Sequence, residues 1–393
     1  MIRAHKIRLN PTPEQQTYLM KAAGTARYAY NWAVAQWRAI EGRKPGALAL
    51  KKQFNAEKPA WAYEVTKCAA EGAFTDFGVA LSNFYAGRAH APEFKQRSKG
   101  HFKFKINNDR LDVVGHWVKI PKLGLVNLAE NLRFDGKILG ATVSREAAWW
   151  YISITVERPD SHGCALPAQC GIDAGLLRLA TLSDGITIEA VRPLRNLRAR
   201  IKRLQQLLET KQKGSHNREK LKAKIARLHK QVRDIRDDLL HKLTTWLARN
   251  YGFIAVEDLN VAGMLQNHKL ALSLSDAALG RMLALLESKV VAHNGEVVKV
   301  GRFFPSSKTC VRCKAKRKKL SLSERTFTCA NCGFTLDRDW NAAINILHEG
   351  LRVASNTGRP VVAMTDVNSP LTGYNLDQGL RMITFDHIRI PER

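Results

Sequence analysis

Four cysteines in the C-terminal part of the chain fall into two closely spaced pairs. Cys310, Cys313, Cys329 and Cys332 follow the pattern C-x2-C-x15-C-x2-C. Four thiolates in this spacing fit one tetrahedral Zn²⁺, and a shell closed by four protein ligands is structural rather than catalytic. The alternatives are four unrelated buried thiols, which the paired spacing disfavours, and an iron–sulfur cluster, for which a redox partner motif is missing. The spacing therefore predicts one structural zinc ion.

The segment between the two cysteine pairs is strongly basic. It reads KAKRKK from Lys314 to Lys319, and we take Lys316 and Arg317 as candidate contacts to phosphate. A solvated charged loop is the alternative interpretation of the same residues.

Carboxylates recur beside apolar runs in the same half of the chain. Asp173 lies in CGIDAG, Glu257 ends FIAVE, and Asp337 and Asp339 precede WNAAINIL. Each alone is weak, since an Asp near a glycine is typical of a turn. Together they would repel one another unless cations lay between them, and oxygen ligands suit Mg²⁺. Two such ions are what two-metal phosphodiester hydrolysis requires. Spacing alone leaves open which of Asp337 and Asp339 caps the helix and which is the ligand.

The elements around these carboxylates predict an α/β arrangement for residues 168–352. Two apolar strands carry Asp173 and Glu257, and a hairpin turns around residues 183–185. Long helices cover 194–250 with a break at KGSHN, an amphipathic helix covers 275–294, and EVVKVGRFF forms another strand. Because strand ends and helix starts meet at one edge of such a sheet, the carboxylates are expected to converge there.

The N-terminal half shows a different pattern of predicted helices and strands. Residues 2–10 alternate like a strand, and Thr12, Pro13 and Gln15 predict a helix start with a capping box. The chain is expected to be helical up to about residue 90. Short β-rich runs over 101–158 indicate a small barrel or sandwich. Residues 158–167 have the composition of a linker, and the chain after 355 lacks a strong pattern.

The charge balance points to a polyanionic partner. The chain has 393 residues, with 63 Lys and Arg against 35 Asp and Glu, a net charge of +28. Residues 192–236 hold 16 basic and 3 acidic residues, and we take Arg203, Lys220 and Lys224 as candidate nucleic-acid contacts. A membrane surface is the rival, but no apolar run approaches the ~20 residues of a spanning helix. With no signal-peptide pattern at the N-terminus, we expect a cytoplasmic, nucleoid-associated protein.

Five segments carry a family resemblance. The segments RLNPTPEQ, GIDAGLLRLATLSDG, FIAVEDLN, FFPSSKTCVRC and TCANCGFTLDRDWNAAINIL resemble TnpB (OrfB) proteins of insertion sequences, relatives of type V CRISPR effectors. The resemblance covers roughly residues 1–352. It implies an RNA-guided DNA endonuclease of a transposable element, with a guide RNA from the transposon end and a double-stranded DNA target. It also implies that Asp173, Glu257 and Asp339 are the catalytic, magnesium-binding residues, with Asp337 in support.

The same resemblance implies a domain scheme. Residues 1–10 and 95–160 would form a wedge β-barrel, into which a helical recognition domain at 11–94 is inserted. Residues 168–352 would form a RuvC-like, RNase H-like nuclease domain with a zinc ribbon at 305–335, followed by a tail at 353–393. Lys67 lies on the helix that resembles the family's reader of the motif beside the target; an ordinary solvated lysine is the alternative.

Three other functions compete with guided cleavage. A guide-dependent DNA-binding regulator without effective cleavage would lose acids of the site, and all three are present here. A single-strand transposase would need a His-x-His metal pair, which none of the 12 histidines forms. A junction resolvase would share the acids but would need neither the zinc ribbon nor so large an N-terminal part.

Overall fold

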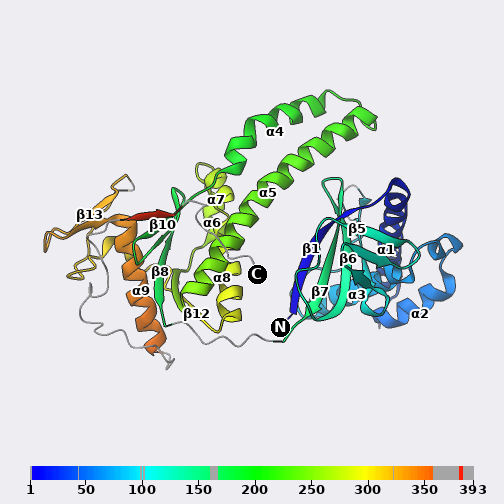
Figure 1. Cartoon of the computed structure of the whole chain (residues 1–393), viewed down its shortest axis with the longest axis horizontal. Helices are drawn as coiled ribbons and strands as arrows, with labels where there is room; N and C mark the ends of the chain where they lie inside the picture. The colour runs from blue at the N-terminus through cyan, green and yellow to red at the C-terminus, as the bar shows by residue number, and fades with distance from the viewer. Residues whose placement is uncertain are drawn as a thin grey trace. The chain divides into compact units, whose positions relative to one another are not determined.

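The computed structural model describes residues 2–42, 44–97, 100, 102–159, 167–321, 323–356 and 380–383. The chain divides into two compact units, Met1–Asp160 and Ser161–Arg393 (Figure 1), called here the N-terminal and C-terminal units. The expected linker at 158–167 spans this boundary, and most of it, including Cys164, lies outside the described residues.

The N-terminal unit is built on one antiparallel sheet of seven strands in the order β2-β6-β7-β1-β5-β4-β3. The strands are β1 (Ile2–Asn10), β2 (Lys103–Asn107), β3 (Asp112–Val114), β4 (Trp117–Ile120), β5 (Gly124–Leu128), β6 (Lys137–Glu146) and β7 (Trp149–Glu157). The N-terminal strand therefore pairs with β5 and β7, more than 100 residues away. Within the described residues the ladder is open at β2 and β3, so closure into a barrel stays a prediction.

Helices pack on this sheet and share its core. They are α1 (Pro13–Ala39), α2 (Ala47–Glu57) and α3 (Lys67–Tyr85), with a short 3-10 helix η1 (Ala60–Tyr63) before α3. The predicted capping box at the start of α1 is confirmed: the Gln15 backbone N–H donates to Thr12 Oγ1, and the Thr12 N–H donates to the Gln15 side chain. Buried residues of α1, α2, α3 and the sheet form a single hydrophobic cluster, so helices and sheet stabilise each other.

The C-terminal unit contains a mixed sheet of six strands in the order β12-β11-β8-β9-β10-β15. These are β8 (Gln169–Ala174), β9 (Arg178–Leu182), β10 (Ile186–Glu189), β11 (Phe253–Glu257), β12 (Glu296–Val300) and β15 (Arg381–Ile383). Strands β8, β11 and β12 run parallel, while β9 is antiparallel to β8 and β10. The hairpin expected around residues 183–185 connects β9 to β10.

Helices cover both faces of the parallel strands, as Figure 1 shows, with α9 (Arg338–Asn356) on one side and α5 (His216–Asn250) and α8 (Leu279–Ala292) on the other. The side chains of β11 alternate between the two faces of the sheet. Phe253 and Ala255 belong to the core under α9, and Ile254 and Val256 belong to the core under α5 and α8. The amphipathic helix predicted over 275–294 has one buried face in α8, formed by Leu279, Met282, Leu283, Leu286 and Val290. The expected single helix is divided at Ala278, whose φ of 48° separates α8 from α7 (Ala271–Ala277).

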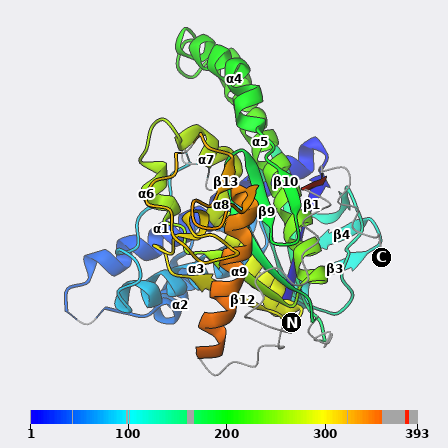
Figure 2. The ribbon, with the colours of Figure 1, turned by 90° about the vertical axis from the view of Figure 1, so that its left-hand side faces the viewer.

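Helix α4 (Pro193–Glu209) and the first part of α5 form a helical hairpin that extends beyond the sheet (Figures 1 and 2). Asp276 of α7 anchors its base. The buried Asp276 carboxylate accepts hydrogen bonds from the Leu194 and Arg195 N–H groups at the start of α4, at 2.8 and 3.1 Å. It also accepts one from Arg236 of α5, at 3.0 Å. One buried charge thus holds both helices of the hairpin.

Parts of the expected tail at 353–393 lie within the described residues. The first residues of the expected tail, 353–356, belong to α9, and 381–383 add β15 to the edge of the sheet beside β10. Among the described residues, no helix combines the length and apolar character needed to cross a membrane.

Candidate active site and metal centre

Asp173 and Glu257 lie side by side at the ends of two neighbouring strands. The parallel ladder between β8 and β11 pairs Ile172 with Val256, and the next residue along each strand is Asp173 and Glu257 respectively. Neighbouring strands are about 4.8 Å apart. Two residues 84 positions apart in the chain are therefore brought together by strand register.

Asp339 enters from the helix that packs on the same strands. It lies in the first turn of α9, and α9 contacts β8, β11 and β12. The nearby Asp337 is held by hydrogen bonds to the backbone of this helix. Its carboxylate accepts from the Asp339 and Trp340 N–H groups at 3.0 and 3.1 Å, which caps the helix. Both Asp337 oxygens also accept from Arg178 Nη1 at 3.0 Å. The spacing left open whether Asp337 or Asp339 caps the helix, and these hydrogen bonds show that Asp337 does.

The electrostatics of Asp173 show how close these acids are. Burial and the negative charges of Glu257, Asp339 and Asp337 raise the pKa of Asp173 well above its usual range, against the opposing effect of Arg338. Like charges at one site disfavour ionisation unless a cation compensates them. The raised pKa is therefore the shift expected where several carboxylates lie near one buried carboxyl group.

Several supporting residues were missed by sequence reasoning. Ser306, which is buried, donates its hydroxyl to Glu257 Oε1 at 2.7 Å and so orients that carboxylate. Arg338 donates to Asp339 Oδ1 through Nε and Nη2, at 3.2 and 3.1 Å. Arg178 reaches Asp339 Oδ2 at 3.7 Å. The one available signal was Arg178 itself, a lone basic residue inside the apolar run LLRLATL.

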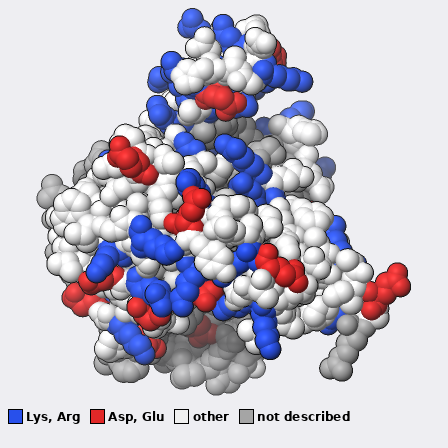
Figure 3. Space-filling view, turned by 90° about the vertical axis from the view of Figure 1, so that its right-hand side faces the viewer, with Lys and Arg blue, Asp and Glu red and all other residues white. Residues whose placement is uncertain are grey.

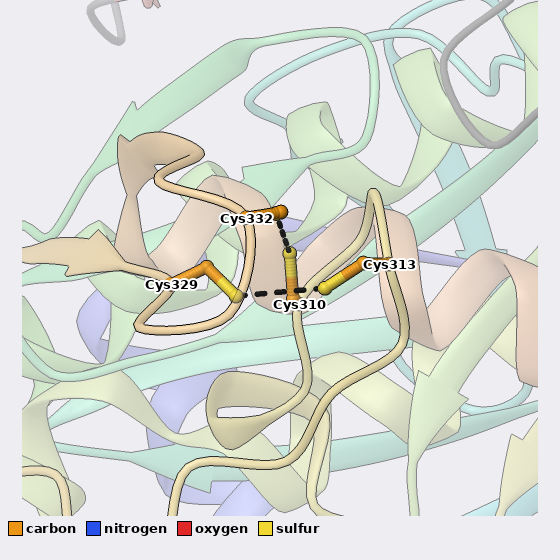
Figure 4. Close-up of side chains that lie close together, drawn as sticks. All are labelled: Cys310, Cys313, Cys329 and Cys332. Carbon is orange, nitrogen blue, oxygen red and sulfur yellow. Dashed lines mark hydrogen bonds between the residues drawn. The ribbon is translucent and has the colours of Figure 1, made fainter.

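The four predicted zinc ligands come together from two loops, as Figure 4 shows. All four Sγ atoms lie within 4.8 Å of one another, with Cys310 to Cys332 at 3.8 Å and Cys313 to Cys329 at 3.5 Å. Four Zn–S bonds of about 2.3 Å in a tetrahedron place the sulfurs about 3.8 Å apart. The sulfurs therefore fit a metal such as zinc, and they are too far apart for disulfides.

The cysteine cluster is tied to the helix that carries Asp339. Two buried asparagines of α9 make the connection: Asn341 donates to Thr309 O at 2.8 Å and accepts from Val311 N–H at 3.1 Å, and Asn345 donates to Ser306 O and Thr309 O. The short strands β13 (Thr326–Thr328) and β14 (Thr335–Asp337) then lead directly into α9. The segments that carry the cysteines are consequently joined to the first two turns of α9.

Hydrogen bonds favour the thiolate form of one of the four cysteines, Cys313, whereas burial raises the pKa of Cys310. A backbone hydrogen bond involving Ala315, followed by the Asn331 side-chain amide, lowers the pKa of Cys313 to about 6. The amide donates to Cys313 Sγ at 3.6 Å. Because thiolate is the form that binds metal, these donors favour ligation.

Lys67 faces a cavity in the N-terminal unit. It is the first residue of α3, is exposed, and lines a cavity of about 490 Å³ together with Lys58, Tyr63, Arg110 and Lys122. The Lys58 ammonium lies 4.5 Å from the centre of the Tyr63 ring. Cations and an exposed aromatic ring at one cavity are typical of nucleic-acid contacts.

The other candidate contacts are spread over the C-terminal unit. Arg203, Lys220 and Lys224 are exposed on the helical hairpin, whose projecting end carries many basic and few acidic side chains in Figure 3. Lys316 is exposed on the ribbon, whereas Arg317 is half-buried and pairs with Glu324 at 2.8 Å. Arg317 is therefore less available to phosphate than Lys316.

Three family models match parts of the chain. The OrfB_IS605 model, described as "Probable transposase", matches residues 153–268, and the Cas12f1-like TNB domain matches residues 280–346. A model described as a helix-turn-helix domain matches residues 1–44. In the described part of that range the structure has a strand and one long helix, β1 and α1.

Similar proteins match nearly the whole chain. A protein of Streptomyces pristinaespiralis, named as a candidate RNA-guided DNA endonuclease, is 36% identical, with 92% of this chain and 95% of the relative covered. A similarly named protein of Escherichia coli K12 is 31% identical, with coverages of 92% and 96%. Among solved structures, Cas12f1 in complex with a single guide RNA and target DNA shares the fold at a TM-score of 0.55 and 13% identity. The structural match covers 88% of this chain and 98% of the Cas12f1 chain. By the identity and coverage of these relatives, the chain belongs to the TnpB (OrfB) family of insertion-sequence proteins.

Proposed function

We propose that this protein is an RNA-guided DNA endonuclease of a transposable element, and that it hydrolyses target DNA at a site formed by Asp173, Glu257 and Asp339. The observation that carries the proposal is the matched register of Asp173 and Glu257, with Asp339 close enough to raise the pKa of Asp173. Membership of a family whose members bear the name of RNA-guided DNA endonucleases supports the same conclusion.

The three carboxylates would hold two Mg²⁺ ions. Such a pair of ions would activate a water molecule and stabilise the charge on the attacking and leaving oxygens. The chain's own contribution is position: strand register holds Asp173 beside Glu257, and Ser306 orients Glu257. The cap formed by Asp337 sets the start of α9 and with it Asp339.

Zinc bound by the four cysteines would support this site indirectly. The ribbon supplies Ser306, which contacts Glu257, and it leads through β14 into α9. Loss of the metal would free both connections at once. We therefore propose a structural role for one Zn²⁺, with no part in the hydrolysis itself.

Guide RNA and target DNA would bind the basic surfaces. We propose that Lys67 contacts the DNA beside the target at the cavity of about 490 Å³. Arg203, Lys220 and Lys224 on the hairpin, and Lys316 and Arg317 on the ribbon, would contact backbone phosphates, with Arg317 limited by its pairing to Glu324. In this proposal the wedge and recognition domains correspond to the N-terminal unit and the nuclease domain to the C-terminal unit. Binding to chromosomal DNA would associate the protein with the nucleoid.

The decisive experiment compares two adjacent carboxylates. Glu257 faces Asp173, whereas Asp258 pairs with Arg302 at 2.7 Å and is 42% exposed. The protein would be purified with its RNA, the RNA sequenced, and a matching duplex with randomised flanks offered with Mg²⁺. We expect Glu257→Gln to reduce cleavage by more than about 100-fold while DNA binding persists, and Asp258→Asn to cleave at the wild-type rate.

Two results would contradict the proposal. Wild-type cleavage by Glu257→Gln would mean that the site is elsewhere. Guided DNA binding without cleavage by the wild-type protein, at any Mg²⁺ concentration, would favour a DNA-binding regulator instead.

A further inference from the structure

Three lysines of the N-terminal unit converge on one carboxylate, Asp76 of α3. Lys105 Nζ lies 2.7 Å from Asp76 Oδ1, and Lys103 Nζ and Lys95 Nζ lie 3.3 and 3.6 Å from Asp76 Oδ2. Three positive charges around one negative charge leave a net +2. Together with Arg27 of α1, which lines the same small cavity, we call these residues the Asp76 pocket.

The Asp76 pocket differs from the other lysine–carboxylate contacts of this unit. Lys6 Nζ lies 2.6 Å from Glu146 Oε1, and Lys21 Nζ lies 2.7 Å from Glu64 Oε2. The Asp76 pocket instead has more positive charge than its carboxylate can compensate, so a further anion would be attracted to it.

The lysine at the centre of the pocket is held in place by its surroundings. The Asn31 side chain donates to Lys95 O at 3.0 Å and accepts from Lys95 N–H at 2.7 Å. The Lys95 ammonium lies 3.4 Å from the centre of the Tyr30 ring, and its side chain is 20% exposed. A long flexible side chain has therefore been fixed with its charge pointing to the pocket, at a cost in conformational entropy.

Burial and neighbouring cations lower the pKa of two basic groups of the pocket, Lys95 and Arg27. Burial, and then Lys103 and Lys105, lower the pKa of Lys95 to about 8, although Asp76 opposes the shift. Burial and the neighbouring Arg97 lower the pKa of Arg27. The charged forms of Lys95 and Arg27 are thus less favoured here than in water, and a bound anion would favour them.

The cavity of the Asp76 pocket has room for one water molecule or one phosphate oxygen atom. Its volume is about 20 Å³, enough for one water molecule, and a phosphate oxygen is of similar size. Cations from three parts of the unit point to it: Arg27 from α1, Lys95 from the loop after α3, and Lys103 and Lys105 from β2. Gly72 makes room for this approach, since a Cβ there would lie 2.6 Å from Lys105 Cβ.

We propose that the Asp76 pocket binds a backbone phosphate of a nucleic acid, with one phosphate oxygen at the cavity and the lysine ammonium groups donating to it. The site contains none of the candidate contacts named from the sequence. It does not depend on the proposed cleavage reaction, because a protein that binds nucleic acid without cutting it would use the pocket in the same way.

The test compares lysines that differ only in their surroundings. Lys103→Gln removes a cation from the pocket, where its side chain is 49% exposed and its loss is tolerable for folding. Lys6→Gln removes the same charge from a lysine outside the pocket, which lies 2.6 Å from Glu146. Affinity for a single-stranded RNA and for a duplex DNA of matched length would be measured over a range of salt concentrations. We expect Lys103→Gln to reduce the salt slope by about 1 and Lys6→Gln to leave it unchanged.

A slope change of about 1 means that a fourfold rise in salt weakens binding about three- to fourfold less than in the wild type. A reduced slope with the RNA probe alone assigns the phosphate to RNA, and a reduced slope with the DNA probe alone assigns it to DNA. A reduced slope with both probes means that the pocket accepts a phosphate of either nucleic acid. Wild-type slopes for Lys103→Gln with both probes, or equal effects of Lys103→Gln and Lys6→Gln, would overturn the proposal.

Asp76→Asn supplies a second test with the opposite sign. If the pocket binds phosphate, removing the competing carboxylate should tighten binding to the responsive probe. If the lysines serve only to neutralise Asp76, the variant should bind no better than the wild type. A folded Asp76→Asn protein, verified by its melting curve, that binds more weakly would refute the site.

Discussion

Gly171 offers a sharp test of how the candidate active site is assembled. It lies in β8, two residues before Asp173, where α9 crosses the strand. A Cβ at this position would lie 2.7 Å from Leu347 N and closer still to Ala343 O, both in the backbone of α9. Backbone atoms cannot rotate away as a side chain can. Gly171→Ala must therefore push α9 off β8.

The size of the effect follows from these contacts. Because non-bonded atoms pack at about 3.5 Å or more, the helix has to shift by about 1 Å. Overpacking of this kind costs about 1–3 kcal/mol, and alanine regains about 0.5–1 kcal/mol over glycine in a strand. We expect a net loss of about 1–2 kcal/mol in the free energy of unfolding. Since α9 carries Asp339 and β8 carries Asp173, a shift of about 1 Å should slow cleavage by about 100-fold.

The assay would separate folding from positioning. Single-turnover cleavage of guide-matched DNA would be measured well below the melting temperature, together with thermal unfolding and DNA binding. Gly301→Ala is the matched control, because an added Cβ there meets no atom within 4 Å; it should leave rate and stability unchanged. A Gly171→Ala protein with wild-type cleavage and melting temperature would show that the spacing of α9 and β8 does not position the site.

Four further predictions concern other parts of the chain. Asp173→Ala should abolish cleavage and leave guided DNA binding intact, which a gel-shift assay with the same guide would check; undiminished cutting would remove Asp173 from the site. Cys310→Ser should lose zinc, measured by metal analysis of the purified protein, and should melt at a lower temperature; full metal content would mean that the ligand set is wrong. Ser306→Ala should lower the cleavage rate by about 10-fold or more with zinc content unchanged, whereas a loss of zinc would reveal a structural role instead. Lys95 has a folded pKa of about 8 against 10.5 in the unfolded chain, so the unfolded state binds more protons between these values and stability should rise with pH across that range. The rise, about 3 kcal/mol, should be absent from Lys95→Met when the two proteins are compared by denaturant titration.

Much of the site could be predicted from local sequence because its parts are local. The paired cysteine spacing is a property of two tight turns, and the sulfurs lie where a tetrahedral metal would need them. Apolar runs marked β8 and β11, each ending near an acid, and the capping box marked the start of α1. Within each cysteine pair, each apolar run and the capping box, the residues lie within a few positions of one another, so short-range geometry is enough to predict each of these parts.

The remaining features depend on contacts between distant parts of the chain. Spacing could not decide between Asp337 and Asp339, because the difference lies in hydrogen bonds and in Arg178, which is about 160 residues away. Register between β8 and β11 placed Asp173 beside Glu257. The chain by itself determined which residue types were available and which short segments would fold. Tertiary structure decided which of them meet, because strand register and helix packing are set by the burial of whole faces.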